Sequence, residues 1–306
     1  MTAQRNQRTV ILGTDWWTDC DDVAAVRIAC RLARQGVWTL AGVILNACMP
    51  YSAASLDGFL RAEGMDIPIG IDTEATDFGR NPPYQQLLAE RTGSSCTNAD
   101  CETGVRLYRR LLAALPDGEA ELIEIGYPQV LAALLASPPD DLSPLDGHTL
   151  VMTKVRTLWI MGGNWAKDGS GRENNFSRNQ RAVLGARNVI AHFPSEIRFL
   201  GYEVGSSVIT HPSSDESDLL HIAYRAHGSL GGRSSWDPML VLMAAKCPDA
   251  DDAQLAAAGY TTVRGTASVD AEGNNHFAPA PDGRHRYVKK LYEDRRYSDQ
   301  IDALIG

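Results

Sequence analysis

The chain has 306 residues, 44% of them hydrophobic, so it can bury a large core and is not expected to be disordered. Its 29 Lys and Arg side chains stand against 38 Asp and Glu, a formal net charge of -9, which argues against a nucleic-acid phosphate backbone as partner. No apolar run reaches membrane-spanning length and the polar start contains no signal-peptide core, so we expect no membrane partner and a cytoplasmic location.

The elements predicted in chain order alternate between strands and helices. Near-continuous apolar runs predict the strands, and amphipathic stretches predict the helices between them. This alternation indicates an α/β fold, an open and mostly parallel sheet with helices on both faces. The predicted strands are 9–14, 38–46, 67–71, 121–126, 156–161 and 196–202, and the predicted helices are 23–34, 51–63, 103–115, 129–136 and 179–192.

The pattern changes after Gly205. Helices are predicted at 216–226 and 238–245, followed by short strands at 261–269 and 276–280. We interpret residues 1–306 as one domain in which 206–306 is mainly helical and partly forms a cap. Within this part, Asp237 followed by Pro238 is typical of a helix start with aspartate as N-cap, although a functional carboxylate fits equally well.

An acidic cluster follows the first predicted strand directly, with Asp15, Asp19, Asp21 and Asp22 inside eight residues. Such close like charges need solvent, helix N-terminal amides or a cation to neutralise them, and their hard oxygen atoms favour calcium or magnesium. The alternative is a solvated acidic turn that caps the next helix. The carboxyl end of a strand is where open α/β sheets bind ligands, which favours a site.

Polar residues also follow the later strands, and their convergence at one edge indicates a pocket. They are Asn46, Gln129 soon after Gly126, the Met161 to Asn164 turn, and Tyr202 with Glu203. Within the acidic cluster, Trp16 and Trp17 are expected either to form pocket walls or to pack in the core beneath the loop.

These segments, in order, resemble motifs of the inosine–uridine-preferring nucleoside hydrolase family, from about Val10 to about Val263. The sequence GTDWWTDCDDVAA at 13–25 is similar to the family's D-x-D-x-G-x-D-D-A-x-A. Gly13 replaces the first aspartate, and two additional residues bring in Asp19. The resemblance implies a nucleoside hydrolase-like, Rossmann-like fold.

The resemblance also implies a calcium site. Asp15 and Asp22 correspond to calcium ligands, and the backbone carbonyl of Gln129, in IGYPQVL at 125–131, takes the place of a threonine carbonyl that binds the ion. Trp236-Asp237-Pro238 is similar to the family's H-D-P, which makes Asp237 a further ligand.

The ribose contacts implied by the resemblance come from separate segments. Met161-Gly162-Gly163 matches the family's M-G-G, and 173–176, ENNF, is similar to its E-x-N. The residues that are expected to bind the substrate are Asp21, Asn46, Met161, Glu173, Asn175 and Trp236.

The implied activity is calcium-dependent hydrolysis of the N-glycosidic bond of a ribonucleoside, with Asp15 accepting a proton from the attacking water. The implied assembly is a homo-oligomer, a dimer or tetramer. Trp236 stands where part of the family has a histidine that protonates the leaving base, so we expect it to stack on the base instead.

Two other functions fit the same residues. The first is a ribosyl-binding protein on the same fold that has lost catalysis, which the missing histidine favours. The second is a phosphohydrolase with Asp15 as nucleophile, which would require a small turn residue in place of Trp16-Trp17 and a lysine after a later strand.

Overall fold

The structure is a computed structural model that describes residues 8–249 and 251–306. Residues 1–7, which formed most of the polar start considered above, lie outside the described residues. None of the helices in the described part of the chain is both long and apolar enough to cross a bilayer.

The fold is built on one mixed sheet of eleven strands, parallel from β4 to β13 and antiparallel from β13 to β7. This confirms the predicted α/β class. In spatial order the strands are β4 (Glu102–Thr103), β3 (Ile69–Ile71), β2 (Thr39–Leu45), β1 (Thr9–Thr14), β5 (Ala120–Glu124), β6 (Val155–Met161), β8 (Glu196–Leu200), β13 (His285–Lys290), β11 (Tyr260–Val269), β12 (Asn274–Pro279) and β7 (Gly171–Arg172). A small second sheet pairs β9 (Ile209–Thr210) with β10 (Arg233–Ser234).

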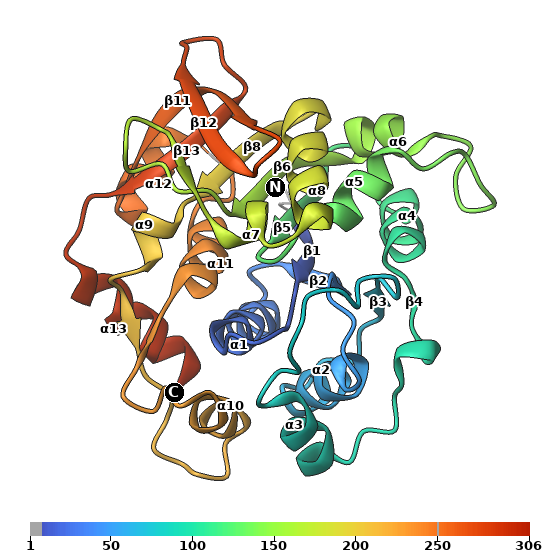
Figure 1. The fold of residues 1–306 in the computed structure, drawn as a ribbon, viewed down its shortest axis with the longest axis vertical. Coiled ribbons are helices and arrows are strands. Elements are labelled where there is room, and N and C mark those ends of the chain that lie inside the picture. Colours follow the sequence, from blue (N-terminus) through green and yellow to red (C-terminus); the bar gives the residue numbers. More distant parts are fainter. Residues whose placement is uncertain (1–7, 250) are drawn as a thin grey trace, which may run out of the picture.

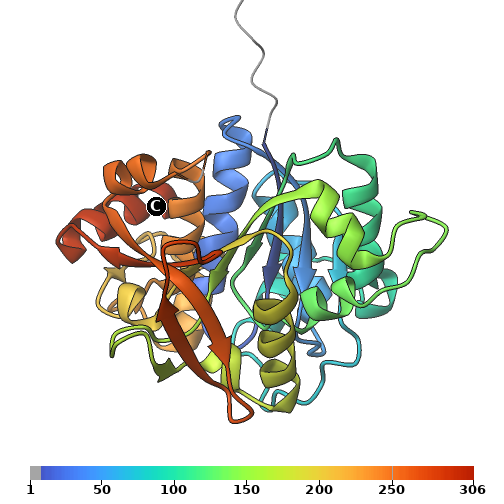
Figure 2. The same ribbon diagram turned by 90° about the horizontal axis from the view of Figure 1, so that it is seen from above.

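Helices cover both faces of the sheet (Figure 1 and, from above, Figure 2). One layer contains α1 (Asp21–Arg34), α2 (Ser52–Ala62), α3 (Gln85–Thr92), α10 (Leu219–His227), α11 (Trp236–Lys246), α12 (Asp252–Ala258) and α13 (Asp294–Ile305). The other contains α4 (Gly104–Ala114), α5 (Gln129–Leu135), α6 (Gly147–Lys154) and α8 (Gln180–His192). Two short helices, α7 (Asn174–Ser177) and α9 (Tyr202–Gly205), lie beyond the carboxyl ends of the central strands.

The central strands read as continuous apolar runs because both of their faces are buried. In β1, Val10 and Leu12 belong to the core under α1 and α11, whereas Ile11 belongs to the core under α5 and α8. Successive side chains of a strand point to opposite faces, so both faces of this strand carry apolar side chains that pack in the core.

The C-terminal part of the chain differs from the prediction in its detail. The strands β11 and β12 were expected, and they pair antiparallel, but β13 was not expected, and it joins that pair to the main sheet through parallel pairing with β8. Six helices of the described residues were also missed: α3, α6, α7, α9, α12 and α13. In α6 the helix runs without a break into β6, so no turn signal separates the two elements in the sequence.

Gly13, at the end of β1, leaves room for a buried carboxylate from the next strand. A Cβ atom at this position would lie 2.2 Å from Oε2 of Glu124 on β5. Glu124 accepts hydrogen bonds through Oε1 from Asn46 Nδ2 at 2.9 Å and from the Gly126 N–H at 3.0 Å. Burial raises the pKa of Glu124 to about 8.

We predict that Gly13→Ala destabilises the protein by about 1–3 kcal/mol, because a methyl group overpacks the site of the Glu124 carboxylate. Denaturant unfolding of Gly13→Ala, Glu124→Ala and the double variant measures the coupling between the two positions. The cost of the added methyl should largely disappear in the Glu124→Ala background. Strictly additive costs would contradict this packing.

Candidate functional site

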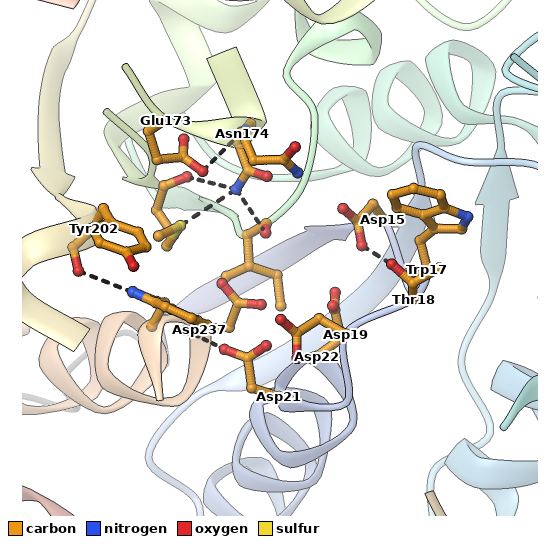
Figure 3. Close-up of a pocket in the computed structure, with 14 residues that line it drawn as sticks. Asp15, Trp17, Thr18, Asp19, Asp21, Asp22, Glu173, Asn174, Tyr202 and Asp237 are labelled. Atoms are coloured by element: carbon orange, nitrogen blue, oxygen red, sulfur yellow. Dashed lines mark hydrogen bonds between the residues drawn. The ribbon is translucent and has the colours of Figure 1, made fainter. Parts of the chain in front are cut away.

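A pocket of about 210 Å³ opens at the carboxyl edge of the sheet, beyond β1, β5 and β6 (Figure 3). Residues far apart in the sequence meet there, as the convergence of polar strand ends predicted. The lining residues are Asp15, Trp17, Thr18, Asp19, Asp21, Asp22, Ile125, Met161, Glu173, Asn174, Asn175, Tyr202, Trp236 and Asp237.

Buried carboxylates form one side of this pocket. Oxygen atoms of Asp21, Asp22 and Asp237 lie within 4.8 Å of one another. Asp22 is held by the Thr14 hydroxyl and by the Trp16 N–H at 3.2 Å. The structure therefore brings together acids from the start of α1 and from α11, more than 200 residues later.

The start of α11 leaves the Asp237 carboxylate free to face the pocket. The predicted N-cap role of Asp237 is wrong, because the helix begins two residues earlier than expected, at Trp236 after Ser235. Pro238 is tolerated in the first turn, where a backbone N–H would have no helical partner. Among the described residues, no hydrogen-bond donor or cationic side chain contacts the Asp237 carboxylate; only its backbone N–H is engaged, by Asp21 Oδ2 at 3.2 Å.

The acids repel one another in a region that excludes water. Burial, reinforced by the charges of Asp19 and Asp21, raises the pKa of Asp15 to about 7. Burial also raises the pKa values of Asp21, Asp22 and Asp237 well above their usual range, and neighbouring carboxylates add to the effect. A cation or bound protons would therefore relieve the repulsion within this cluster.

Asp19, which the two additional residues bring in, differs from its neighbours because it has a cationic partner. Arg233 on β10 donates from Nε to Asp19 Oδ1 at 2.8 Å and forms a second hydrogen bond from Nη2. Burial acts to raise the pKa of Asp19, but the hydrogen bonds and charge of Arg233 outweigh it, and the pKa is lowered. Asp19 thus lines the pocket with its charge neutralised by Arg233.

The opposite side of the pocket carries a second group of polar side chains (Figure 3). Glu173, the N-cap of α7, accepts hydrogen bonds from the N–H groups of Asn175 at 2.9 Å and Gly163 at 3.2 Å. Asn175 donates from Nδ2 to the Met161 carbonyl at 3.1 Å, which leaves its amide oxygen without a partner among the described residues. Burial raises the pKa of Glu173 to about 7.

The two tryptophans of the first loop have separate roles. Trp16, in left-handed backbone conformation with φ 46, is fully buried and packs against Phe59 and Tyr84 in the core. Trp17 lines the pocket, and its Nε1 donates to the Arg80 carbonyl at 2.8 Å. Trp16 therefore packs in the core beneath the loop, and Trp17 forms part of the pocket wall.

Trp236 lines the pocket, but other side chains already contact its ring. Tyr202 stacks on it with ring centroids 5.4 Å apart, and the Arg233 guanidinium carbon lies 5.1 Å from the ring. Trp236 Nε1 donates to the Tyr202 carbonyl at 2.9 Å, which fixes the plane of the indole. The pair of aromatic rings, rather than Trp236 alone, forms this part of the wall.

Two of the residues expected at the site do not line the pocket. Asn46 is fully buried and its amide points to Glu124. Gln129 opens α5 and donates from Nε2 to the Asn46 carbonyl at 2.6 Å and to Asp72 at 3.2 Å. Both side chains are thus engaged outside the pocket, and the predicted ribose contact of Asn46 and the predicted calcium contact of the Gln129 carbonyl stay predictions.

Several lining residues were not among the predicted site residues: Trp17, Thr18, Asp19, Ile125, Asn174 and Tyr202. The sequence did indicate Asp19 and Tyr202, since both follow predicted strands at the edge that was expected to form a pocket. Asn174 lies inside the E-x-N segment and donates to the Tyr127 hydroxyl at 3.3 Å. Nothing in the local sequence marks Ile125, which looks like an ordinary strand residue.

Comparison with known proteins identifies the fold. No family model and no curated protein matches the sequence. Among solved structures, the type III effector XopQ complexed with adenosine diphosphate ribose is similar with TM-score 0.66 and 17% identity, covering 99% of this chain and 94% of the effector. The effector XOO4466 is similar with TM-score 0.64 and 16% identity, covering 99% and 95%.

A plant nucleoside hydrolase is similar with TM-score 0.65 and 14% identity, covering 97% of this chain and 98% of that enzyme. At these identities the likeness concerns the fold alone. The chain has a nucleoside hydrolase-like fold, which is broader than the inosine–uridine-preferring family that the motifs resemble.

The chemistry of the acidic side of the pocket fits a divalent cation. Asp15, Asp22 and Asp237 offer hard carboxylate oxygens, the donors that calcium prefers. Asp22 and Asp237 belong to the compact group of oxygens with Asp21, whereas Asp15 lies outside that group but still interacts electrostatically with Asp21. A divalent ion would offset the repulsion among these carboxylates, so the residues present fit the ion expected from the motifs.

We predict that Asp237→Asn weakens calcium binding at least about tenfold, because affinity for calcium depends on the number of charged ligands. Calorimetric titration measures the affinity. The same change should raise the melting temperature of the calcium-free protein, since it removes one of several repelling buried charges.

Asp66→Asn is the matched control, because the Asp66 side chain is 90% exposed and lies outside the pocket. It should change neither quantity. An Asp237→Asn variant that binds calcium as tightly as the unsubstituted protein would contradict the assignment.

Proposed function

We propose that this protein is a calcium-dependent hydrolase of the N-glycosidic bond of ribonucleosides. The observation that carries the proposal is one pocket with unneutralised carboxylates on one side and Glu173 with Asn175 on the other. The nucleoside hydrolase-like fold supports it, as does the ribose-containing ligand bound to one of the similar structures.

Breaking an N-glycosidic bond needs an activated water, stabilisation of positive charge on the sugar, and help for the departing base. When bound by Asp15, Asp22, Asp237 and the Gln129 carbonyl, a calcium ion supplies charge neutralisation and a more acidic water. Asp15 accepts the proton of the attacking water, and the surrounding carboxylates stabilise the positive charge that develops on the ribose.

The sugar is held from both sides of the pocket. Asp21 and Glu173 accept hydrogen bonds from ribose hydroxyls, Asn175 uses its free amide oxygen, and Met161 packs against the ring. Asn46 contributes only if the strand end shifts on binding, because its amide faces Glu124. Such hydrogen bonds discriminate ribose from 2′-deoxyribose, since an unpaired buried polar group costs about 1–3 kcal/mol.

The region 206–306 supplies Trp236 and Asp237 to the pocket, which supports its role as a partial cap. We also propose that the protein acts as a cytoplasmic homo-oligomer, a dimer or tetramer, on a small-molecule ribonucleoside. A ribosyl-binding protein without turnover is the second candidate function. It is favoured by one observation: among the described residues, no histidine lines the pocket.

We predict that Asp15→Asn and Asp15→Ala both lower kcat by about three orders of magnitude or more, because Asp15 is assigned as ligand and as proton acceptor. Turnover of p-nitrophenyl riboside at saturating calcium measures this, and thermal unfolding checks the fold. The exposed Asp66→Asn variant again serves as control. Near-native activity of either Asp15 variant would move the proton acceptor to another acid, with Asp19 the first candidate.

We predict that p-nitrophenyl riboside is hydrolysed much faster than inosine or uridine, because the pocket offers the departing base no histidine. Trp236→His should accelerate the natural nucleosides selectively, and Trp236→Ala should weaken binding by about 1–3 kcal/mol, the value of one stacking contact. Equal rates for activated and natural ribosides would show that another residue protonates the base. Binding of ribose with no turnover of any riboside would establish the second candidate.

A further inference from the structure

A tight turn after α3 brings two cysteines together near the surface. Cys96 and Cys101 flank the 3₁₀ helix η1 (Asn98–Asp100), and both are half-buried free thiols. The Thr97 N–H and hydroxyl donate to Asp100 Oδ2 at 2.8 and 2.7 Å, and the Asp100 N–H donates to the Thr97 carbonyl at 3.0 Å. These hydrogen bonds fold the chain back, so the residues on either side of the turn lie next to each other.

The two sulfur atoms share a backbone partner and interact with each other. Cys96 Sγ and Cys101 Sγ each lie 3.7 Å from the Thr97 carbonyl oxygen. Burial, together with the charge of Cys96 and the hydrogen bond to it, raises the pKa of Cys101 to about 12. Burial also raises the pKa of Cys96, although the hydrogen bond with Cys101 acts in the opposite direction. The turn thus places the two sulfurs within reach of each other, as a disulfide requires.

The turn between the two cysteines supports the start of α2. Asn98 accepts from the Ala53 N–H at 3.0 Å through Oδ1, and it donates from Nδ2 to the Met49 carbonyl at 2.8 Å. It therefore satisfies one of the first N–H groups of α2, which have no partner within the helix. In turn, α2 anchors the loop after β1, because Ser55 Oγ accepts from Trp16 Nε1 at 2.9 Å. Fixing the turn therefore also fixes the start of α2 and, through it, the loop that presents the acids.

We propose that Cys96 and Cys101 are an oxidation site, at which a reversible disulfide locks the turn, with a low-molecular-weight disulfide such as oxidised glutathione as the oxidant. Cys96 lines a surface groove of about 1100 Å³, which gives the oxidant access to its sulfur. In the cytoplasm proposed above, thiols are kept reduced, so the disulfide forms only when the glutathione pool is oxidised. Neither cysteine is among the described residues that line the acidic pocket, so the inference does not depend on the proposed function.

The reaction is thiol–disulfide exchange in two steps. The Cys96 thiolate attacks one sulfur of the oxidant, whose S–S bond breaks and releases one small thiolate. The Cys101 thiolate then attacks the Cys96 sulfur of this mixed disulfide and releases the second small thiolate. The two cysteines together lose two protons and two electrons, and the oxidant is reduced to two small thiols.

Incubation of the full chain with excess oxidised glutathione tests the proposal. Mass spectrometry should show the loss of two hydrogen atoms and a bond between Cys96 and Cys101, and dithiothreitol should reverse both. The rate should rise about tenfold from pH 7 to pH 8, because burial raises both pKa values and only the thiolate reacts. The melting temperature of the oxidised protein should rise by about 2–4 °C, since the disulfide restricts the unfolded chain. Hydrogen exchange at the Ala53 amide should slow.

Cys101→Ser should stop at the mixed disulfide between Cys96 and glutathione, and Cys96→Ser should form no disulfide within the chain. Cys48→Ser is the matched control, because the Cys48 sulfur also lies beside the turn, 3.4 Å from Asn98 Nδ2. It should form the disulfide as the unsubstituted protein does. The proposal would be overturned by stable glutathione adducts on both cysteines, by pairing of either with another cysteine, or by no reaction at pH 9. An unchanged melting temperature and unchanged Ala53 exchange after the bond has formed would equally overturn it.

Discussion

Repulsion among buried carboxylates at the end of β1 is the constraint on which the rest of the site depends. Asp15, Asp21, Asp22 and Asp237 are all nearly inaccessible to solvent, and each has its pKa raised by burial and by its neighbours. Folding holds them together because each is placed by a well-packed element. Arg233 neutralises one further acid, Asp19, and the remaining charge calls for a cation.

Packing and hydrogen bonds of the surrounding elements hold the acidic loop and the neighbouring strand ends in place. Gly13 makes room for the Glu124 carboxylate, and Glu124 orients Asn46. Trp16 adopts a left-handed backbone conformation and anchors the loop in the core, where its Nε1 donates to Ser55 Oγ at 2.9 Å. The loop can therefore present Asp15 and Trp17 to the pocket while its other residues are fixed by packing.

Much of this was predictable from the sequence because it follows from local pattern. The strand ending at Thr14, the acids after it and the polar strand ends imply a sheet edge with a pocket. Three features were not predictable: β13, the start of α11 at Trp236, and the inward turn of Asn46 toward Glu124. Two of them are decided by a partner distant in sequence, β8 for β13 and Glu124 for Asn46, so no local signal exists for these two.

The most direct test of this account is a crystal structure of the protein grown with ample calcium and ribose. The account predicts one ion in contact with Asp15, Asp22 and Asp237 at about 2.3–2.6 Å, the range for calcium and oxygen ligands, with the ribose between the ion and Glu173. A structure obtained under these conditions would contradict the account if the three carboxylates lay far apart, or if they hydrogen-bonded to one another with no ion between them.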